Sequence, residues 1–522
     1  MKAQKARSVA SGISVLGITG IICKLVGVLY SIPLARILGD RGLGLFQTVF
    51  PTYNLLLTLS SAGLPVAVSR MVAHFIAKKN PRDAKMTFRA ALILLSSIGI
   101  LFSFLMLLSV GMLVRLVGAP EAERGFIVIA PCVALVCMLS AFRGFIQGQQ
   151  NMIPTAVSQL IEQVGKVAVS LPLAGIGMQT SIAHGAAGAL LGITIVEALA
   201  LLFMIIHHFI TERNFRALPQ DPDAVPSSVR FIFKRLVIIS VPITISACII
   251  PLAQFIDSAL MVNRMVISGL DRDTATSLYG IFSGMVIRLI NIPTALALAI
   301  SMSLVPAVSS AKALEDHSRI VRECSTGIRY AFLIGFPCAI GMSMMAKQIL
   351  SFFYLETLSP ERLQTASELL TVSALTVVLF TVVQATSSIL QGLHRQKIPM
   401  YTMIAGVLCK IVLNYVLIGI PGINIHGGPV ASLVCYSVSM IPNLYFCCKF
   451  AEMKMDWERW IIRPGLATSC MAAFVWLLRT LLPDGRLSTV FTVGTGIAVY
   501  LIAAFLCKAI TKSDIRSMLR RS

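Results

Sequence analysis

Apolar runs of about twenty residues recur along the whole chain, and each is long enough to cross a hydrocarbon core about 30 Å thick as a helix. Helices are expected because a segment in lipid must satisfy its backbone polar groups internally. Hydrophobic residues make up 56% of the 522 residues, and charged residues make up 13%. This apolar content exceeds what the core of a soluble protein of this size uses. The sequence therefore predicts an all-α polytopic membrane protein.

About fourteen membrane spans are predicted. They lie near residues 10–35, 44–66, 90–114, 125–147, 153–176, 186–208, 236–261, 277–304, 328–346, 366–389, 400–419, 428–447, 464–482 and 488–507. The first follows a basic N-terminus, as in a secretory signal, but its apolar run is too long for one. We interpret it as a retained span.

The net charge of +21 is distributed unevenly between the two sides of the predicted membrane. Most of the 44 lysines and arginines fall on one side, including the N-terminus, the loop 70–89 and the tail after 507. The positive-inside rule makes that side cytoplasmic, so both termini are expected inside. Contact with anionic membrane lipids accounts for this basic surface, and no nucleic-acid partner is needed.

No catalytic, metal or cofactor site is recognised. The twelve cysteines lie mostly within spans, and the adjacent Cys447 and Cys448 lack metal-ligand or redox spacing. Neither a phosphate-binding glycine loop nor a convincing set of catalytic residues is present in the sequence. The chain is therefore predicted not to be an enzyme. If it is a transporter, the energy would come from a gradient across the membrane or from an imbalance of the substrate itself between the two sides.

An internal repeat is predicted, because several landmarks recur about 242 residues apart and in the same order. The repeated landmarks are Pro51-Thr52 with Pro293-Thr294, Leu64-Pro65 with Val305-Pro306, Gln147-Gly148 with Gln391-Gly392, and His184-Gly185 with His426-Gly427. Two homologous six-helix bundles follow, at 1–210 and 231–450, related by an axis along the membrane normal. The polar, proline-rich segment 211–230 is the predicted cytoplasmic linker, and 451–522 holds two extra helices and a cytoplasmic tail.

Three segments carry a family resemblance. They are ARILGDRGLGLF at 35–46, which follows Lys24, SSAGLPVAVSRMVA at 60–73, and RGFIQGQQNMIPTAVSQLIEQVGKV at 143–167. They resemble the polysaccharide-exporter branch of the multidrug/oligosaccharidyl-lipid/polysaccharide (MOP) superfamily, which includes the multidrug (MATE) exporters. Within this branch, the chain resembles the stage V sporulation protein B family, which is related to the lipid II flippases. The resemblance implies a V-shaped pair of bundles around a central cavity, alternating access, and a role in spore cortex peptidoglycan.

Charges inside membrane spans are costly, so each of them needs a partner or a function. The candidates are Lys24, Lys166, Arg288 and Lys410 among cations, and Glu162, Glu197 and Asp257 among acids. Glu162 and Lys166 lie four residues apart on one helix face and are predicted to pair. All the charges in this set except Lys24 and Arg288, including Glu162 and Lys166, are secondary candidates.

Lys24 and Arg288 have no acidic residue three or four positions away, so their counter-charge comes from elsewhere. A lipid pyrophosphate would supply it. The resemblance implies functional cavity cations on the first and eighth helices, where these two residues fall. Asn54 and Asn291 complete the predicted substrate-binding set. The alternative is that Lys24 and Arg288 pair with Glu197 or Asp257 on other helices.

Several other residues have a structural interpretation beside the functional one. Pro51 and Pro293 should kink their helices and are candidate hinges, although a static kink is an equal alternative. His184 and His426 are interpreted as turn residues at external helix starts. Arg143 and Gln147 lie at a cytoplasmic end, where we interpret the charge as a topology signal.

The function predicted from sequence is a flippase that moves a polyprenyl-pyrophosphate-linked glycan across the bacterial cytoplasmic membrane. A lipid II-like precursor is the expected substrate, and cell-wall synthases are the candidate protein partners. The alternatives are export of another lipid-linked polysaccharide unit, cation-coupled drug efflux, and a non-transporting scaffold for cell-wall synthesis.

Overall fold

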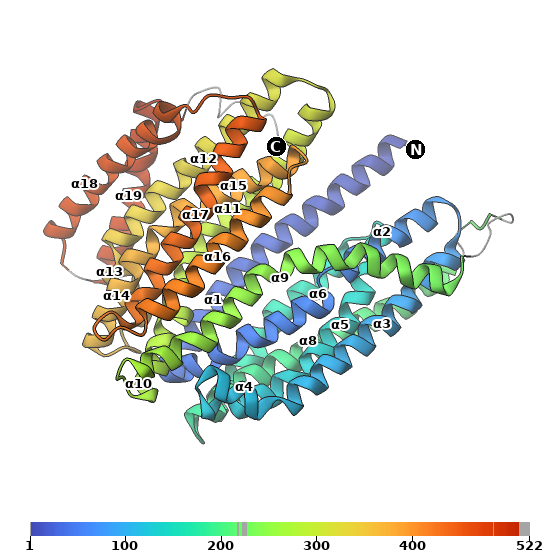
Figure 1. The fold of residues 1–522 in the computed structure, drawn as a ribbon, viewed down its shortest axis with the longest axis horizontal. Helices are drawn as coiled ribbons and strands as arrows, with labels where there is room; N and C mark the ends of the chain where they lie inside the picture. Colours follow the sequence, from blue (N-terminus) through green and yellow to red (C-terminus); the bar gives the residue numbers. More distant parts are fainter. Residues whose placement is uncertain (1, 217–218, 222–226, 484, 511–522) are drawn as a thin grey trace. The chain divides into compact units, whose positions relative to one another are not determined.

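The structure is a computed structural model. It describes residues 2–216, 219–221, 227–483 and 485–510, with side chains described there except at 2–18, 21, 24, 25, 28, 214, 216 and 299. Every regular element in these ranges is helical (Figure 1). The backbone separates into two compact units, residues 1–280 and 281–522. This division reflects how the helices pack. The predicted six-helix halves at 1–210 and 231–450 were defined by a sequence repeat instead, and they stay a prediction.

Thirteen stretches of the described chain are long and apolar enough to cross a membrane. Each coincides with one of the predicted spans from the second to the fourteenth. The first predicted span, 10–35, lies on helix α1 (Lys2–Ser61), where most side chains fall outside the described set. The all-α polytopic fold is thus confirmed, and the total of fourteen spans remains a prediction.

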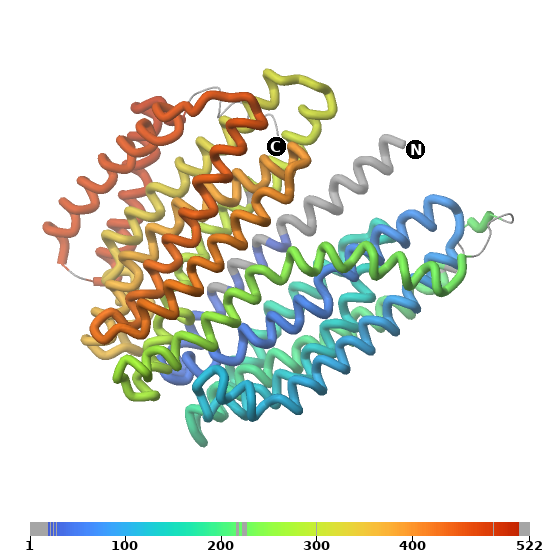
Figure 2. The backbone as a smooth tube through the Cα atoms, viewed as in Figure 1, coloured from blue at the N-terminus to red at the C-terminus, as the bar shows by residue number. Residues whose placement is uncertain are grey.

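The described residues of the N-terminal unit form ten α-helices and two short segments of other helical types. They are α1, α2 (Leu64–Ala77), α3 (Pro81–Leu108), α4 (Val110–Val117), the 3-10 turn η1 (Pro120–Ala122), α5 (Glu123–Gly148), α6 (Ile153–Gly165), the π-helical η2 (Lys166–Ser170), α7 (Leu171–Met178), α8 (Ile182–Arg216), α9 (Val229–Ile267) and α10 (Arg272–Tyr279). Figure 2 follows the same path as a tube.

Helix α1 carries the first two predicted spans, one on each side of a break at Gly39. This residue has φ 67° and ψ −176°, a backbone conformation that glycine adopts without the steric cost a side chain brings. Pro51 is buried within the second part of α1. The kink and the hinge expected there stay predictions.

The described part of the predicted linker is held against the N-terminal unit. The Asp221 amide donates to Lys79 O at 2.9 Å. Ser227 N donates to the buried Asp83 carboxylate at 2.9 Å, and the Ser228 hydroxyl caps α9. The loop after α2 and the first turn of α3 therefore anchor the two described ends of the linker.

The C-terminal unit begins in the π-helical segment η3 (Gly280–Val286), and its described residues form nine α-helices. The elements after η3 are α11 (Ile287–Ala313), α12 (His317–Met344), α13 (Ala346–Tyr354), α14 (Pro360–Ala374), α15 (Thr376–Gly392), α16 (Lys397–Leu417), the 3-10 turn η4 (Asn424–His426), α17 (Gly427–Phe450), the π-helical η5 (Glu458–Ile462), α18 (Arg463–Leu481) and α19 (Arg486–Leu506). Pro293, the counterpart of Pro51 in the predicted repeat, lies buried within α11.

The last two helices, α18 and α19, are attached along the length of α12. Near one end the fully buried Trp460 donates its indole N–H to Ser325 Oγ at 2.9 Å. In the middle, Tyr500 Oη donates to Leu333 O at 2.6 Å, and at the other end Arg479 Nη1 donates to Met344 O at 2.7 Å. A cluster around Met345, Met471 and Tyr500 fills the space between these helices. The two extra helices are therefore an integral part of this unit.

Candidate functional site

Four charged side chains gather inside the N-terminal unit: Arg143, Glu162, Lys166 and Glu197, called here the charge cluster. The exposed fractions of these side chains are 15%, 12%, 19% and 6%, so all four are mostly withdrawn from solvent. They come from α5, α6, η2 and α8 respectively. Buried charges persist only when they are paired, so their arrangement defines what the site can do.

The first pair joins α5 to α6. Arg143 Nη2 donates to Glu162 Oε1, while its Nε donates to Ser158 Oγ at 2.9 Å. One guanidinium thus serves two side chains a turn apart on α6, using the fixed fork of donors that arginine offers. The Ser158 hydroxyl in turn donates to Thr155 O at 2.8 Å. The Arg143–Glu162 pair is therefore a hydrogen-bonded connection between two helices.

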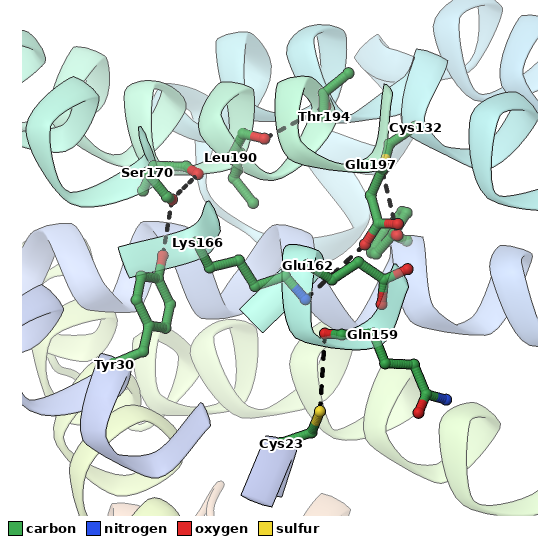
Figure 3. Close-up of polar contacts among 12 residues, drawn as sticks. Cys23, Tyr30, Cys132, Gln159, Glu162, Lys166, Ser170, Leu190, Thr194 and Glu197 are labelled. Atoms are coloured by element: carbon green, nitrogen blue, oxygen red, sulfur yellow. Dashed lines mark hydrogen bonds and ion pairs between the residues drawn. The ribbon is translucent and has the colours of Figure 1, made fainter. Parts of the chain in front are cut away.

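The second pair is looser. Lys166 Nζ lies 3.9 Å from Glu197 Oε1, beyond the length of a hydrogen bond (Figure 3). The other carboxylate oxygen, Glu197 Oε2, is buried without a hydrogen-bond partner in the described structure. Lys166 opens the π-helical segment η2, a local widening of the helix that is frequent at functional sites. Glu197 is thus incompletely satisfied.

This pairing corrects the prediction that Glu162 pairs with Lys166. The spacing rule treats a helix in isolation, whereas α5 brings a guanidinium that bonds Glu162 directly, and Lys166 faces Glu197 of α8. Arg143, interpreted from sequence as a topology signal, is the residue that sequence reasoning missed here. A signal was present, since Arg143 and Ser158 lie at similar distances from the turn at 149–152 that joins α5 to α6.

Neutral polar contacts surround the charge cluster (Figure 3). Tyr30 Oη and Ser170 Oγ are 2.8 Å apart, and Ser170 also donates to Ala189 O. These contacts tie α1 to η2 and α8. Cys132 Sγ donates to Tyr53 Oη at 3.3 Å, and Cys23 Sγ donates to Gln159 O at 3.7 Å. The described surroundings thus contain hydroxyl, thiol and carbonyl groups.

The predicted substrate-binding residues belong to both units. Asn54 on α1 donates its amide to Gln254 Oε1 of α9 at 3.3 Å, within the N-terminal unit. Arg288 and the exposed Asn291 lie on α11 of the C-terminal unit, with Arg288 half-buried. The Lys24 side chain lies outside the described residues. The structure therefore leaves the predicted binding set as a prediction.

The remaining charged candidates are Asp257 on α9 and Lys410 on α16, both half-buried. Glu197, one of the two acids considered as a partner for Lys24 or Arg288, lies 3.9 Å from Lys166. The alternative that Lys24 or Arg288 pairs with Glu197 or Asp257 stays a prediction. Among the described residues no group of three histidine, cysteine or acidic side chains is placed to hold a metal ion.

The fold is shared with solved transporters of the MOP superfamily. Solved structures with this fold include "Lipid II flippase MurJ, inward closed conformation", with a TM-score of 0.70, 14% identity, and coverage of 93% of this chain and 97% of that one. An inward-facing MATE family multidrug transporter has a TM-score of 0.69 and 17% identity over 85% of this chain and 100% of its own. At these identities the likeness establishes the fold.

The chain belongs to the family described as polysaccharide biosynthesis protein, which matches residues 9–312, and the MatE family matches residues 242–416. Among curated relatives, lipid II flippase MurJ of Bacillus subtilis (strain 168) is 25% identical over 446 residues, covering 82% of this chain and 80% of the relative. Stage V sporulation protein B of the same organism is 25% identical over 421 residues, 80% of each chain. The resemblance found in the sequence is thereby confirmed.

Proposed function

We propose that this protein is a flippase that moves a polyprenyl-pyrophosphate-linked glycan across the bacterial cytoplasmic membrane by alternating access. The observation that carries the proposal is the similarity to a lipid II flippase along 82% of the chain, together with the shared fold. A lipid II-like precursor is the substrate we favour. The similarity to a stage V sporulation protein supports a use in spore cortex synthesis.

We assign the pyrophosphate to Lys24 and Arg288, and the neighbouring polar groups of the substrate to Asn54 and Asn291. Guanidinium and ammonium groups stabilise phosphate oxygens by charge-assisted hydrogen bonds, and arginine adds a two-pronged geometry. The charge cluster supports this assignment indirectly. Its two cations are engaged by Glu162 and Glu197, so they are not the first candidates for an anionic headgroup.

The direct test is flipping by the purified full-length protein in liposomes. The substrates should be a lipid II-like precursor, a polyprenyl-pyrophosphate with an unrelated glycan, and a polyprenyl-monophosphate sugar. Transport of the first alone supports the lipid II-like substrate, and transport of both pyrophosphates supports a broader polysaccharide exporter. Transport of the monophosphate at an equal rate contradicts the pyrophosphate assignment.

The residue assignment is tested with Arg288→Ala. Flipping should fall about tenfold or more, because a hydrogen bond to a charged group contributes about 1.5–3 kcal/mol. Protein abundance should be unchanged, and Arg288→Lys should rescue only partly. The exposed Arg322→Ala on α12 is the matched control. Recovery of flipping in Arg288→Ala combined with Asp257→Asn would make Arg288 a structural partner and contradict the assignment.

Cation-coupled drug efflux is the second candidate, favoured by the MatE match over residues 242–416. It predicts uptake of a cationic dye into inverted vesicles and no flipping of any lipid-linked glycan. A non-transporting scaffold predicts neither activity, together with full complementation of a deletion strain by a Lys24→Ala/Arg288→Ala variant. Both outcomes are distinct from those expected of a flippase.

A further inference from the structure

Glu197 is the most enclosed member of the charge cluster, with 6% of its side chain exposed. One carboxylate oxygen lies 3.9 Å from Lys166 Nζ and the other has no hydrogen-bond partner in the described structure. A buried carboxylate that keeps its charge normally accepts two or three hydrogen bonds. Glu197 lacks these donors, so its ionised form is poorly stabilised at this place.

The charged and titratable groups near Glu197 come from α1, α5, α6 and η2. Glu162 of α6 adds a negative charge, whereas Lys166 of η2 and Arg143 of α5 add positive charges. Tyr53 of α1 and Cys132 of α5 are the neutral titratable neighbours. Two carboxylates and two cations thus share one enclosed region, and their formal charges sum to zero when all four are ionised. A single added proton changes that sum to plus one.

The same surroundings favour a proton over a metal cation. A metal ion would lie beside both Arg143 and Lys166 and be repelled by them. Within the described part of the chain, no third acidic, histidine or cysteine ligand joins Glu162 and Glu197 in a metal-binding group. A proton needs no coordination shell. Bound to one carboxylate oxygen, it turns that oxygen into a hydrogen-bond donor.

We propose that Glu197 is a proton-binding site and that its loading with a proton is coupled to transport. Proton uptake on Glu197 neutralises the counter-charge of Lys166 and raises the charge of the cluster by one. A more positive N-terminal unit binds an anionic headgroup more tightly, and by linkage the bound anion favours the proton equally. This coupling rests on the proposed flippase function, whereas the proton site itself does not.

Infrared difference spectroscopy on the full-length protein in lipid films tests the proton site without any transport. Acidification should produce a carboxylic-acid C=O band that is lost in Glu197→Gln and retained in Glu197→Asp. The matched control is Glu212→Gln, on the same helix α8, where the glutamate is paired with Lys85. If Glu197→Gln accumulates poorly, Lys166→Met/Glu197→Gln removes both members of the pair and should also lose the band.

A band that persists in both variants would overturn the proposal. Replacing choline chloride with sodium chloride at constant pH should leave the spectrum unchanged, and a sodium-induced carboxylate shift that requires Glu197 would assign a metal ion instead.

In liposomes, flipping should depend on an imposed pH gradient, and Glu197→Gln should lose that dependence. Retained dependence would refute the coupling. Absence of flipping in the native protein, with the band present, would refute the proposed function alone.

Discussion

Arg41 Nη2 lies 2.7 Å from Asp273 Oδ1 and 2.9 Å from Glu121 Oε1, so one guanidinium ties the start of α10 and the turn η1 to α1. Beneath it, α1 and α10 touch through their backbones. A methyl group on Gly44 would lie 2.1 Å from Thr276 O, and one on Gly280 would lie 2.1 Å from Asp40 O. Ion pairs and glycine contacts thus hold α10 in place together.

Arg41→Ala should loosen α10 with little effect on global stability, because ion pairs this exposed contribute about 0–1 kcal/mol each. Thr276 is 3% exposed, so a Thr276→Cys thiol should react slowly in the native background and faster in Arg41→Ala. Salt at about 1 M should have a similar effect by screening the pairs. Arg115→Ala, at an exposed arginine on α4, is the control and should change nothing.

Gly280→Ala should destabilise the N-terminal unit more than Arg41→Ala. The added methyl group meets a backbone carbonyl, which cannot rotate away, and overpacking of this kind costs about 1–3 kcal/mol. Gly111→Ala on α4 is the matched control, since a methyl group there has nothing within 4 Å. Loss of monodisperse protein on heating, measured by size-exclusion chromatography, compares the two. Equal stability of both variants would contradict the backbone contact.

The attachment of α10 should fail only in strong acid. The Asp271 carboxylate accepts hydrogen bonds from the Thr274 hydroxyl and from the amides of Asp273 and Thr274, which lowers its pKa below the ordinary value. A lowered native pKa means that this stabilisation is present above the unfolded pKa of about 3.9 and is lost as the pH falls through the native value. Relative to an exposed cysteine at the same pH, the reactivity of Thr276→Cys should therefore stay low at about pH 5. In Asp271→Ala this relative reactivity should be high throughout.

The membrane spans were predictable because lipid imposes a simple physical requirement. A stretch of about twenty apolar residues is visible without knowing its neighbours, and spans two to fourteen match the structure. The interruption between the first two predicted spans lies at Gly39, within the ARILGDRGLGLF segment that carried the family resemblance. The apolar pattern along the chain and the family resemblance were enough to predict the spans and the interruption between the first two.

The pairing of charges was less predictable, because it depends on which helices meet. Glu162 has a plausible partner four residues away in Lys166, yet its guanidinium partner comes from another helix. The same limit applies to the packing division at Gly280, which lies at the start of a π-helical segment rather than at the polar linker around Asp221. Sequence spacing describes one helix at a time, and these features involve several.

The described linker residue Asp221 should be cytoplasmic, as should both termini, because the basic segments fall on one side under a single alternation of spans. A reporter active only in the cytoplasm, fused at Asp221, should be active. A fusion at Gln364, between the ninth and tenth predicted spans, should be inactive. The reverse pattern would overturn the topology and the internal repeat with it.

Among single substitutions in the charge cluster, Arg143→Ala should cause one of the largest losses in the stability of the folded protein. It leaves the Glu162 carboxylate, 12% exposed, without its guanidinium, and removing one partner of a buried pair costs about 3–5 kcal/mol. Arg124→Ala, at an exposed arginine on the same helix α5, is the control and should be neutral. Thermal stability and membrane abundance should both fall in Arg143→Ala.

A second substitution distinguishes the Arg143–Glu162 pair from the Glu162–Lys166 pair that sequence spacing predicts. In Arg143→Ala/Glu162→Gln no stranded carboxylate remains, so stability should recover well beyond that of Arg143→Ala alone. Lys166→Met should be milder than Arg143→Ala, because the 3.9 Å contact to Glu197 includes no hydrogen bond to lose. If Lys166→Met were instead as destabilising as Arg143→Ala, and Glu162→Gln rescued it, then Lys166 would be the functional partner of Glu162.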